Sequence, residues 1–348
     1  MIFLTGATGF VGSALLKRLV DDGVDVFALV REGSHSLPAG VKSLTWDLSA
    51  LAEIGGLPPH FVSYNDRKQN QNDGKDFNGL DSLAMTLKNS DVVVHAAARA
   101  HIMNDESIDP LAEYRKVNRD ATLTLASLAA ESGVKRFVFI SSIKVNGEMT
   151  SAGMPFEAEI SEPPVDPYGL SKYEAEQGLL EIANETGMEV VIIRPPLVYG
   201  PGAPGNFASL VNWVKRGIPL PLGSVQNQRS LVALDNLVDF IALCADRERS
   251  PKAANEVFLI SDGREVSTSE LLRSVAKAYG VKSRLLPIPV GLMKFAAKLL
   301  GKGAVADRLF ANLQVDSLKA HELLGWKLVI TMDQQLAKMA EYDKKSFK

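Results

Sequence analysis

Short apolar runs alternate with longer amphipathic segments through the first two hundred residues of the chain. The runs are rich in Val, Ile and Phe with little polar alternation, which is typical of strands covered on both faces. The order predicts an α/β fold with a doubly wound parallel sheet. The expected strands are 2–5, 24–30, 42–46, 91–95, 136–141 and 189–194, and the expected helices between them include 11–21, 111–131 and 167–185.

The amino-acid composition changes after Arg194, where the Pro- and Gly-rich run PPLVYGPGAPGN begins. We expect the chain to leave the first domain, residues 1–193, at this point and to return to it over 230–260. Residues 194–229 and 261–348 are expected to form a smaller, mostly helical lobe. Residues 65–79 (NDRKQNQNDGKDFNG) contain no aliphatic side chain, which predicts a mobile polar loop.

Composition excludes several classes of protein. The chain has 348 residues and a formal net charge of -3, which argues against a protein built to follow a nucleic-acid backbone. The beginning MIFLTGATGF lacks a basic leader, and no apolar run reaches the roughly 20 residues of a membrane span, so a cytoplasmic protein is expected. Cys244 is the one cysteine, and we interpret it as a buried core thiol. No metal site is expected.

A glycine-rich turn follows the first expected strand directly. The segment GATGFVG occupies positions 6–12, with a helix opening inside it. Glycine allows a sharp turn and a close approach of phosphate to backbone N–H groups, and the helix amino end adds positive potential. The turn predicts a dinucleotide site and makes the first domain a Rossmann domain. The residues expected at the cofactor are Gly6, Thr8, Gly9, Phe10, Val11 and Gly12.

The end of the second strand bears on the choice between NAD and NADP. A carboxylate there accepts hydrogen bonds from a free ribose 2′-hydroxyl, but this chain has Arg31, which suits a 2′-phosphate and favours NADP. Glu32 keeps NAD open, and Arg31 as a plain surface charge is the alternative. Asp47 and Leu48, after the third strand, are expected near the adenine, although Asp47 could simply cap a helix.

Small residues close the fourth strand. Ala96 and Ala97 follow His95 and would let a dinucleotide lie across the strand ends. His95 itself is interpreted as structural.

Tyr168 and Lys172 lie four residues apart and therefore on one face of an expected helix. A hydride transfer at a carbinol carbon needs a partner for the hydroxyl proton, and a phenol serves if a nearby ammonium lowers its pKa. The spacing alone proves little. Ser141 and Ser142 strengthen the interpretation of this pair as catalytic, because they end the fifth strand, on the rim where ligands bind in such sheets.

With these residues the chain resembles the extended short-chain dehydrogenase/reductase family, within it the nucleotide-sugar epimerases, dehydratases and keto-reductases. The resemblance runs from the glycine turn to a C-terminal segment over 316–326. It implies that Ser142 binds the reacting sugar oxygen, that Tyr168 is the acid/base and that Lys172 lowers its pKa and holds the nicotinamide ribose. It also implies that Asn118 lies near the active site. Family members are usually homodimers through the helices 111–131 and 167–185.

Two further matches point to a sugar nucleotide. By the resemblance, Asn206 and Arg229 stand where family members hold the substrate diphosphate. A guanidinium meets phosphate in two hydrogen bonds. A helix N-cap is the alternative for Asn206, and a surface charge is the alternative for Arg229.

The residues after Ser142 narrow the reaction. Dehydratases of the family carry an Asp-Glu pair there, whereas this chain has Ile143 and Lys144, so a dehydratase is not expected. Lys144 and Asn146 replace residues typical of UDP-galactose epimerases, and a bulky cation at the sugar's edge opposes rotation of a keto intermediate. Arg31 agrees with a cofactor such as NADPH that is released after each turnover. Together, Lys144, Asn146 and Arg31 favour a reductase.

The favoured reading is an NAD(P)-dependent UDP-4-keto-6-deoxy-N-acetylglucosamine 4-reductase, which makes UDP-N-acetylquinovosamine for bacterial surface polysaccharide such as O-antigen. The alternative is a UDP-glucose or UDP-N-acetylglucosamine 4-epimerase. A non-catalytic dinucleotide sensor is the remote third possibility, because Ser142, Tyr168 and Lys172 are all present.

The stretch 285–300 is apolar with Lys294 and Lys298 one turn apart. A helix of this pattern can lie on a membrane surface. We expect instead a core helix of the second lobe.

Overall fold

The computed structural model describes residues 1–34, 37–54, 77–100, 107, 109–301 and 303–346. They divide into two compact units. The first comprises Met1–Val145, Ser161–Arg194 and Val238–Phe258, and the second comprises Asn146–Ile160, Pro195–Leu237 and Leu259–Lys348.

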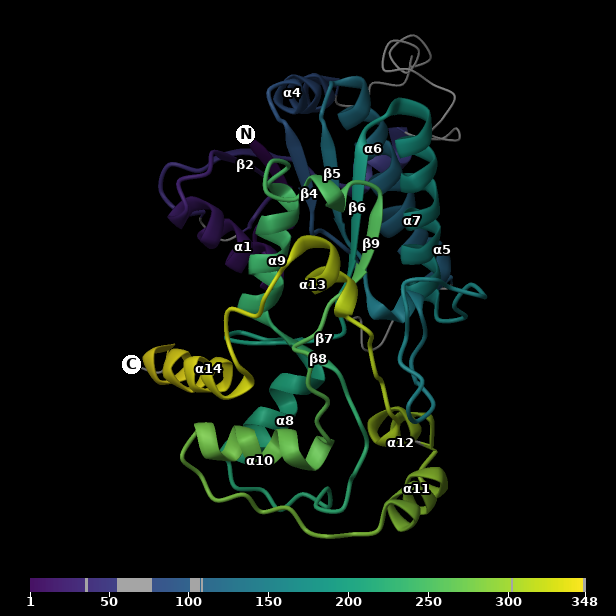
Figure 1. Ribbon diagram of the computed structural model, residues 1–348, viewed down its shortest axis with the longest axis vertical. Helices are drawn as coiled ribbons and strands as arrows, with labels where there is room; N and C mark the ends of the chain where they lie inside the picture. Colours follow the sequence, from purple (N-terminus) through teal and green to yellow (C-terminus); the bar gives the residue numbers. More distant parts are fainter. Residues whose placement is uncertain (35–36, 55–76, 101–106, 108, 302, 347–348) are drawn as a thin grey trace. The chain divides into compact units, whose positions relative to one another are not determined.

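The first unit is built on parallel strands and their crossover helices (Figure 1). Its elements are β1 (Ile2–Thr5), α1 (Phe10–Asp21), β2 (Val26–Val30), β3 (Lys42–Thr45), α2 (Ser49–Ile54), α4 (Phe77–Lys88), β4 (Val92–His95), α5 (Pro110–Arg115), the π-helix η1 (Lys116–Asp120), α6 (Ala121–Glu131), β5 (Arg136–Ile140), the 3₁₀ turn η2 (Ile143–Val145), α7 (Pro167–Thr186), β6 (Glu189–Arg194), α9 (Leu234–Ala245), the 3₁₀ turn η3 (Pro251–Ala253) and β9 (Glu256–Leu259).

The strands form one sheet in the order β3-β2-β1-β4-β5-β6-β9. The pairs from β3 to β6 are all parallel. The chain moves outward from β1 to β3 and then restarts on the other side of β1 with β4, so the order reverses between β1 and β4. Ligands of such sheets bind outside the carboxyl ends of the strands at this reversal. The predicted doubly wound fold is confirmed.

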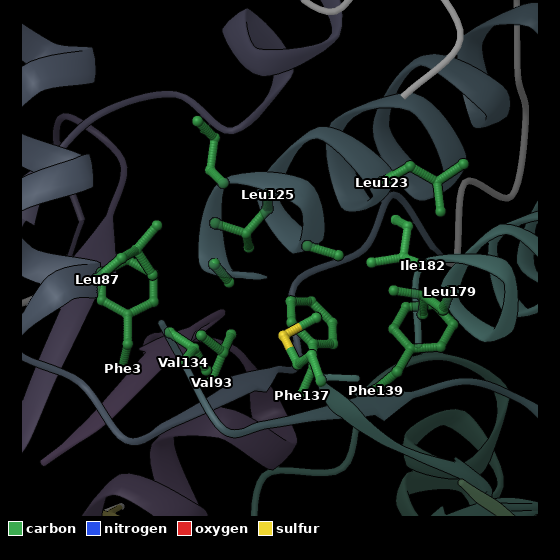
Figure 2. Packing of buried hydrophobic residues seen from close by; sticks show 14 of the residues in the cluster. Phe3, Leu87, Val93, Leu123, Leu125, Val134, Phe137, Phe139, Leu179 and Ile182 are labelled. Carbon is green, nitrogen blue, oxygen red and sulfur yellow. The ribbon is translucent and has the colours of Figure 1, made fainter. Parts of the chain in front are cut away.

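One face of the sheet packs on α2, α4, α6 and α7. Figure 2 shows Phe139 beneath Leu179 and Ile182 of α7, with Phe137 beside it, and Phe3 next to Leu87 of α4. The three phenylalanines have no exposed surface, and each stabilises the fold by roughly 1.5–3 kcal/mol relative to an exposed ring. Strand residues alternate in direction, so this layer takes every second side chain of the central strands.

The other face packs on α1 and α9 (Figure 1). Leu15, Leu16 and Leu19 supply the buried stripe of α1. The Arg18 guanidinium joins α1 to α9 by a 3.0 Å ion pair with Asp239. Both faces of the sheet are thus covered, which explains why its strands show no polar alternation.

The second unit is mostly helical. Its elements are β7 (Leu197–Tyr199), α8 (Gly205–Lys215), β8 (Leu231–Ala233), α10 (Thr268–Ala278), α11 (Val290–Leu299), α12 (Gly303–Phe310), α13 (Leu318–Leu324) and α14 (Met332–Ser346). β7 and β8 form a separate parallel pair, Leu197 opposite Leu231.

The units differ from the expected boundaries in two places. Residues 230–237 lie in the second unit, because β8 pairs with β7 rather than with the large sheet. Residues 146–160 also lie there, because Thr150 and Phe156 bridge to Asn312 and Val315.

Three element predictions need correction. The expected helix 111–131 is interrupted by the π-helix η1. The polar loop expected over 65–79 ends earlier, since α4 begins at Phe77, and positions 65–76 lie outside the described residues. The expected core helix within 285–300 is wrong, since α11 has no buried residue. Among the described residues, no helix is long and apolar enough to cross a membrane.

Candidate active site

The glycine turn closes tightly between β1 and α1. Gly6 has φ +70, and the Gly9 N–H donates to the Gly6 carbonyl at 2.9 Å. A Cβ on Gly6 would lie 2.6 Å from the Ala97 nitrogen, and one on Gly12 would lie 2.0 Å from the Gly6 oxygen. No other residue fits at these two positions.

The amino end of α1 is not closed by a side chain. Gly9 is its N-cap and makes no side-chain capping bond, while Thr8, Phe10 and Val11 are partly buried along the turn. A helix amino end with glycine in front of it leaves backbone N–H groups and positive potential available for phosphate. The geometry therefore fits the pyrophosphate of a dinucleotide.

The carboxyl ends of β1 and β4 are held together beside this turn. The Ala96 N–H donates to the Thr5 carbonyl and the Ala97 N–H donates to the Thr5 hydroxyl, each at 3.3 Å. Ala97 is also the residue that Gly6 approaches most closely. Any side chain at Gly6 would therefore push the carboxyl ends of β1 and β4 apart.

His95 is fully buried between these elements. Its Nδ1 lies 2.7 Å from the Thr5 hydroxyl and its Nε2 lies 3.0 Å from the Thr122 hydroxyl of α6. Burial, helped by the charge of Lys172, lowers the pKa of His95 to about 3. A neutral ring bonded at both nitrogens ties β1, β4 and α6 together.

The residues expected at the adenosine end lie at the ends of β2 and β3. Arg31 and Glu32 are both exposed. The Asp47 carboxylate accepts a hydrogen bond from the Ser49 N–H at 2.9 Å, so it closes the first turn of α2. Leu48 is 7% exposed and belongs to the core.

Ser142 and Tyr168 meet at the carboxyl end of β5. Their hydroxyl groups are hydrogen-bonded to each other. Asp166 caps α7 by accepting from the Gly169 N–H at 2.9 Å, and Pro167 follows it. A Cβ on Gly169 would lie 2.5 Å from the Lys144 carbonyl oxygen. Glycine there lets the first turn of α7 settle on η2, which brings the tyrosine to the serine.

Lys172 lies one turn along α7 and is 1% exposed. Its Nζ donates to the Ile140 carbonyl at 3.0 Å and lies 4.3 Å from the centre of the Phe139 ring. Burial lowers the pKa of Lys172 to about 7, against an opposing effect of Glu176. Ser142 and Tyr168 therefore meet through their hydroxyl groups, Lys172 follows one turn later on the same helix, and the catalytic roles of all three stay predictions.

The surroundings of Tyr168 raise the pKa of its phenol, and the effect expected from Lys172 stays a prediction. Burial raises the pKa of Tyr168 to about 12, and the bond from Ser142 offsets only part of that rise. Burial lowers the pKa of Lys172 as well, to about 7, so the amine is only partly protonated at neutral pH.

A buried polar network joins α7 to the carboxyl ends of β5 and β6. Glu176 and Arg194 form an ion pair with Nη2 and Oε2 at 2.5 Å, and they are 0% and 3% exposed. The Ser141 hydroxyl donates to the same carboxylate. Sequence reasoning missed this network. Its signal was a carboxylate four residues after Lys172, on the same helix face.

Asn118 lies in the π-helix η1 and is fully buried. Its side-chain oxygen accepts from the Arg99 N–H at 2.9 Å, and its amide donates to the Ser171 hydroxyl at 3.0 Å. Ser171 in turn donates to the Tyr168 carbonyl at 2.8 Å. The extra residue of a π-turn aims this side chain at α7, a common device near functional sites.

Lys144 points to the start of α7. Its Nζ lies 3.3 Å from the Asp166 carboxylate, which also caps the helix. Asn146, in the second unit, donates to the Glu157 carbonyl at 2.6 Å.

The two residues expected at a diphosphate lie in the second unit. Asn206 is exposed at the second position of α8, whose N-cap is Pro204, so the alternative of an asparagine cap is wrong. Arg229 Nη1 donates to the Arg308 and Ala311 carbonyls at 3.1 and 3.3 Å. Arg229 is therefore anchored at the carboxyl end of α12 rather than a free surface charge.

Residues 2–260 match the model of the NAD dependent epimerase/dehydratase family. The chain belongs to this family. The epimerase/dehydratase is accordingly an NAD-dependent enzyme, and the expected family, enzyme class and Rossmann fold are confirmed. The preference for NADP over NAD stays a prediction.

Individual relatives of this epimerase/dehydratase are similar over the whole chain. A UDP-glucose 4-epimerase of Vibrio cholerae is 45% identical over 342 residues, 98% of this chain and 94% of the relative. An N-acetyl-alpha-D-glucosaminyl-diphospho-ditrans,octacis-undecaprenol 4-epimerase of Escherichia coli O157:H7 is 27% identical over 98% of this chain and 95% of its own. A UDP-glucose 4-epimerase of Thermotoga maritima, solved with UDP-glucose, has a TM-score of 0.72 at 22% identity and covers 100% of this chain and 99% of its own. These names favour the alternative reading, an epimerase, over the expected reductase.

Proposed function

We propose that this enzyme is a UDP-sugar 4-epimerase that interconverts UDP-glucose or UDP-N-acetylglucosamine with its C4 epimer. The proposal is carried by the 45% identity to a UDP-glucose 4-epimerase over 98% of the chain. The hydrogen-bonded Ser142 and Tyr168 supply the groups that the reaction needs at C4.

Epimerisation at C4 is an oxidation followed by a reduction on the opposite face. In the forward half, Tyr168 as phenolate takes the proton of the C4 hydroxyl, and Ser142 holds the same oxygen by a hydrogen bond. In the return half, Tyr168 gives the proton back to the carbonyl oxygen of the 4-keto sugar. A nicotinamide held at the glycine turn would supply the hydride acceptor and donor that this oxidation and reduction require.

The proton step requires that the pKa of Tyr168 fall from about 12. Ser142 already acts in that direction, because its hydrogen bond favours the phenolate. We propose that Lys172 completes the shift in its protonated form, since its pKa of about 7 lets it exchange a proton at neutral pH. In this proposal Lys172 takes up and releases a proton at neutral pH and does not stay protonated throughout.

Lys144 no longer argues for a reductase. Only a cation at the edge of the sugar would oppose rotation of a keto intermediate there. The bond between its Nζ and the Asp166 carboxylate at 3.3 Å supports a role in shaping the first turn of α7. We propose that role for Lys144 in place of a substrate contact.

We propose NAD as the resident cofactor. The glycine turn, with Gly6 and Gly12 in contact with backbone, would hold its pyrophosphate, and Ala96 and Ala97 would line its path across the strand ends. Glu32 is the ribose acceptor in this proposal, while Asp47 and Leu48 would flank the adenine. Bound cofactor that is reduced and reoxidised in each cycle needs no 2′-phosphate recognition by Arg31.

For the substrate diphosphate we propose Asn206 and Arg229. Arg229 is anchored through one nitrogen to two carbonyl groups, which fixes the direction of its guanidinium. A fixed guanidinium fork suits bidentate binding of phosphate. The homodimer expected through α5, α6 and α7 remains part of this proposal.

One experiment separates the readings. The purified protein is incubated with UDP-glucose and with UDP-N-acetylglucosamine without added cofactor, and separately with UDP-4-keto-6-deoxy-N-acetylglucosamine and NADPH or NADH. C4 inversion in the first pair, followed by NMR, is the expected result. Stoichiometric oxidation of added cofactor only with the keto sugar would overturn the epimerase.

Tyr168→Phe tests the site itself. We expect it to lower turnover by at least roughly a hundredfold while the protein still binds NAD, because only the proton transfer is removed. Tyr173→Phe on the same helix is the matched control and should keep full activity. Equal activity in both variants would contradict the role of Tyr168, and absence of turnover in every form would favour the sensor.

A further inference from the structure

The helix α11 carries an apolar face that nothing in the described chain covers. Leu292, Phe295 and Leu299 are 58%, 62% and 73% exposed, and Leu300 after them is 74% exposed. Positions three and four residues apart share one face of a helix. The helix has no buried residue.

The opposite side of α11 packs on α12, its neighbour in Figure 1. Val290, Met293 and Ala297 are the half-buried residues of that side. Lys294 binds Asp307 of α12 at 2.9 Å, which fixes the pair of helices. The contact with α12 therefore holds the opposite, apolar side of α11 outward.

The segment that carries this face is basic, although Lys294 pairs with Asp307 of α12 and Lys277 pairs with Asp333 of α14. Residues 271–306 contain no Asp or Glu, although the whole chain has a net charge of -3. The basic residues of this stretch are Arg273, Lys277, Lys282, Arg284, Lys294, Lys298 and Lys302. Exposed Leu and Phe beside lysines form the pattern that inserts into the interface of an anionic bilayer, with the lysine stems reaching to the headgroups.

We propose that α11 docks the enzyme on the surface of an anionic membrane, with Leu292, Phe295 and Leu299 in the acyl boundary. Ten residues at 1.5 Å rise make a helix of about 15 Å, so it lies in the plane of the interface and does not cross the bilayer. A second copy of this chain is a poorer occupant, because a twofold contact through this face would bring two sets of lysines together.

Vesicle flotation tests the proposal with the full-length protein. Vesicles of phosphatidylglycerol and phosphatidylcholine in equal parts should carry the protein upward, and vesicles of phosphatidylcholine alone should not. The doubly substituted Phe295→Ser/Leu299→Ser protein should bind at least about tenfold more weakly. Lys298→Gln should weaken binding about fivefold, and added salt should weaken it further.

Met85→Ser is the matched control, since Met85 is an apolar side chain 71% exposed on α4 of the first unit. It should leave binding unchanged. None of these residues belongs to the catalytic site, so every variant should convert a soluble UDP-sugar at the normal rate, and the outcome is independent of the proposed epimerase activity.

Three outcomes overturn the proposal. The first is absence of binding to the anionic vesicles, and the second is equal binding to both kinds of vesicle. The third is a lower molar mass of Phe295→Ser/Leu299→Ser in sedimentation without vesicles, since the apolar face would then join two copies of the chain.

Discussion

Replacing Lys172 with methionine should stabilise the folded protein at neutral pH while it abolishes turnover. The lysine is 1% exposed, and burial lowers its pKa from 10.5 to about 7. Methionine has a similar length and carries no charge to desolvate. A group kept for its chemistry at a cost in stability is expected at an active site.

The magnitude follows from proton linkage. With a pKa of 10.5 in the unfolded chain and about 7 in the folded one, burial of the amine costs about 4 kcal/mol at pH 7 and about 2 kcal/mol at pH 9. The unfolded state binds more protons in this window, so stability rises with pH there. Methionine loses the bond from Nζ to Ile140, which costs roughly 1–3 kcal/mol. The variant should therefore gain about 2 kcal/mol at pH 7 and nearly nothing at pH 9.

Urea titrations of the wild type and of Lys172→Met at both pH values measure the effect. Above about pH 9 the thiol of Cys244, whose pKa burial raises, begins to titrate in the unfolded chain, so the window ends there. Lys135→Met is the control, since Lys135 is exposed. It removes the same charge and should show no pH-dependent difference from the wild type.

The reasoning is refuted by a stability difference between Lys172→Met and the wild type that is the same at pH 7 and pH 9. Such a result would mean that Lys172 stays charged in the folded protein. A variant that keeps its turnover would refute the assigned role of the amine in the proton step.

Three further predictions concern the support of the site. Glu176→Gln should cost about 3–5 kcal/mol in urea titrations, because the buried Arg194 guanidinium loses the carboxylate that balances its charge. Replacing both residues by leucine should recover most of the loss. Gly169→Ala should lower kcat about tenfold or more and cost about 1–3 kcal/mol, because its Cβ would meet a carbonyl oxygen of η2 at 2.5 Å. Gly291→Ala, where nothing lies within 4 Å, should leave kcat unchanged. His95 stays neutral in the folded protein down to its pKa of about 3, whereas the same ring takes up a proton below about pH 6.5 in the unfolded chain. Stability in urea titrations should therefore fall as pH drops below about 6.5, and a flat profile would contradict the lowered pKa.

The Rossmann half of the fold was predictable because its signals are local. Buried parallel strands show as uninterrupted apolar runs, and the turn between β1 and α1 needs glycine locally, because Gly6 has φ +70 and Gly12 packs on the Gly6 carbonyl. The pair Tyr168 and Lys172 followed from helical spacing in the same way. The boundaries of the second unit were less predictable. The apolar run of β8 is compatible with either sheet, and its pairing with β7 is visible only in the folded structure.

By itself, the sequence determined the family, the doubly wound sheet and the glycine turn, and it predicted the group of Ser142, Tyr168 and Lys172. Only the tertiary structure decided where the neighbouring side chains point: Ser141 to Glu176, and Lys144 to Asp166. It also decided that the apolar face of α11 stays exposed. The physical reason is range, since backbone propensity and periodicity act over a few residues, whereas burial and pKa depend on segments that meet only after the chain has folded.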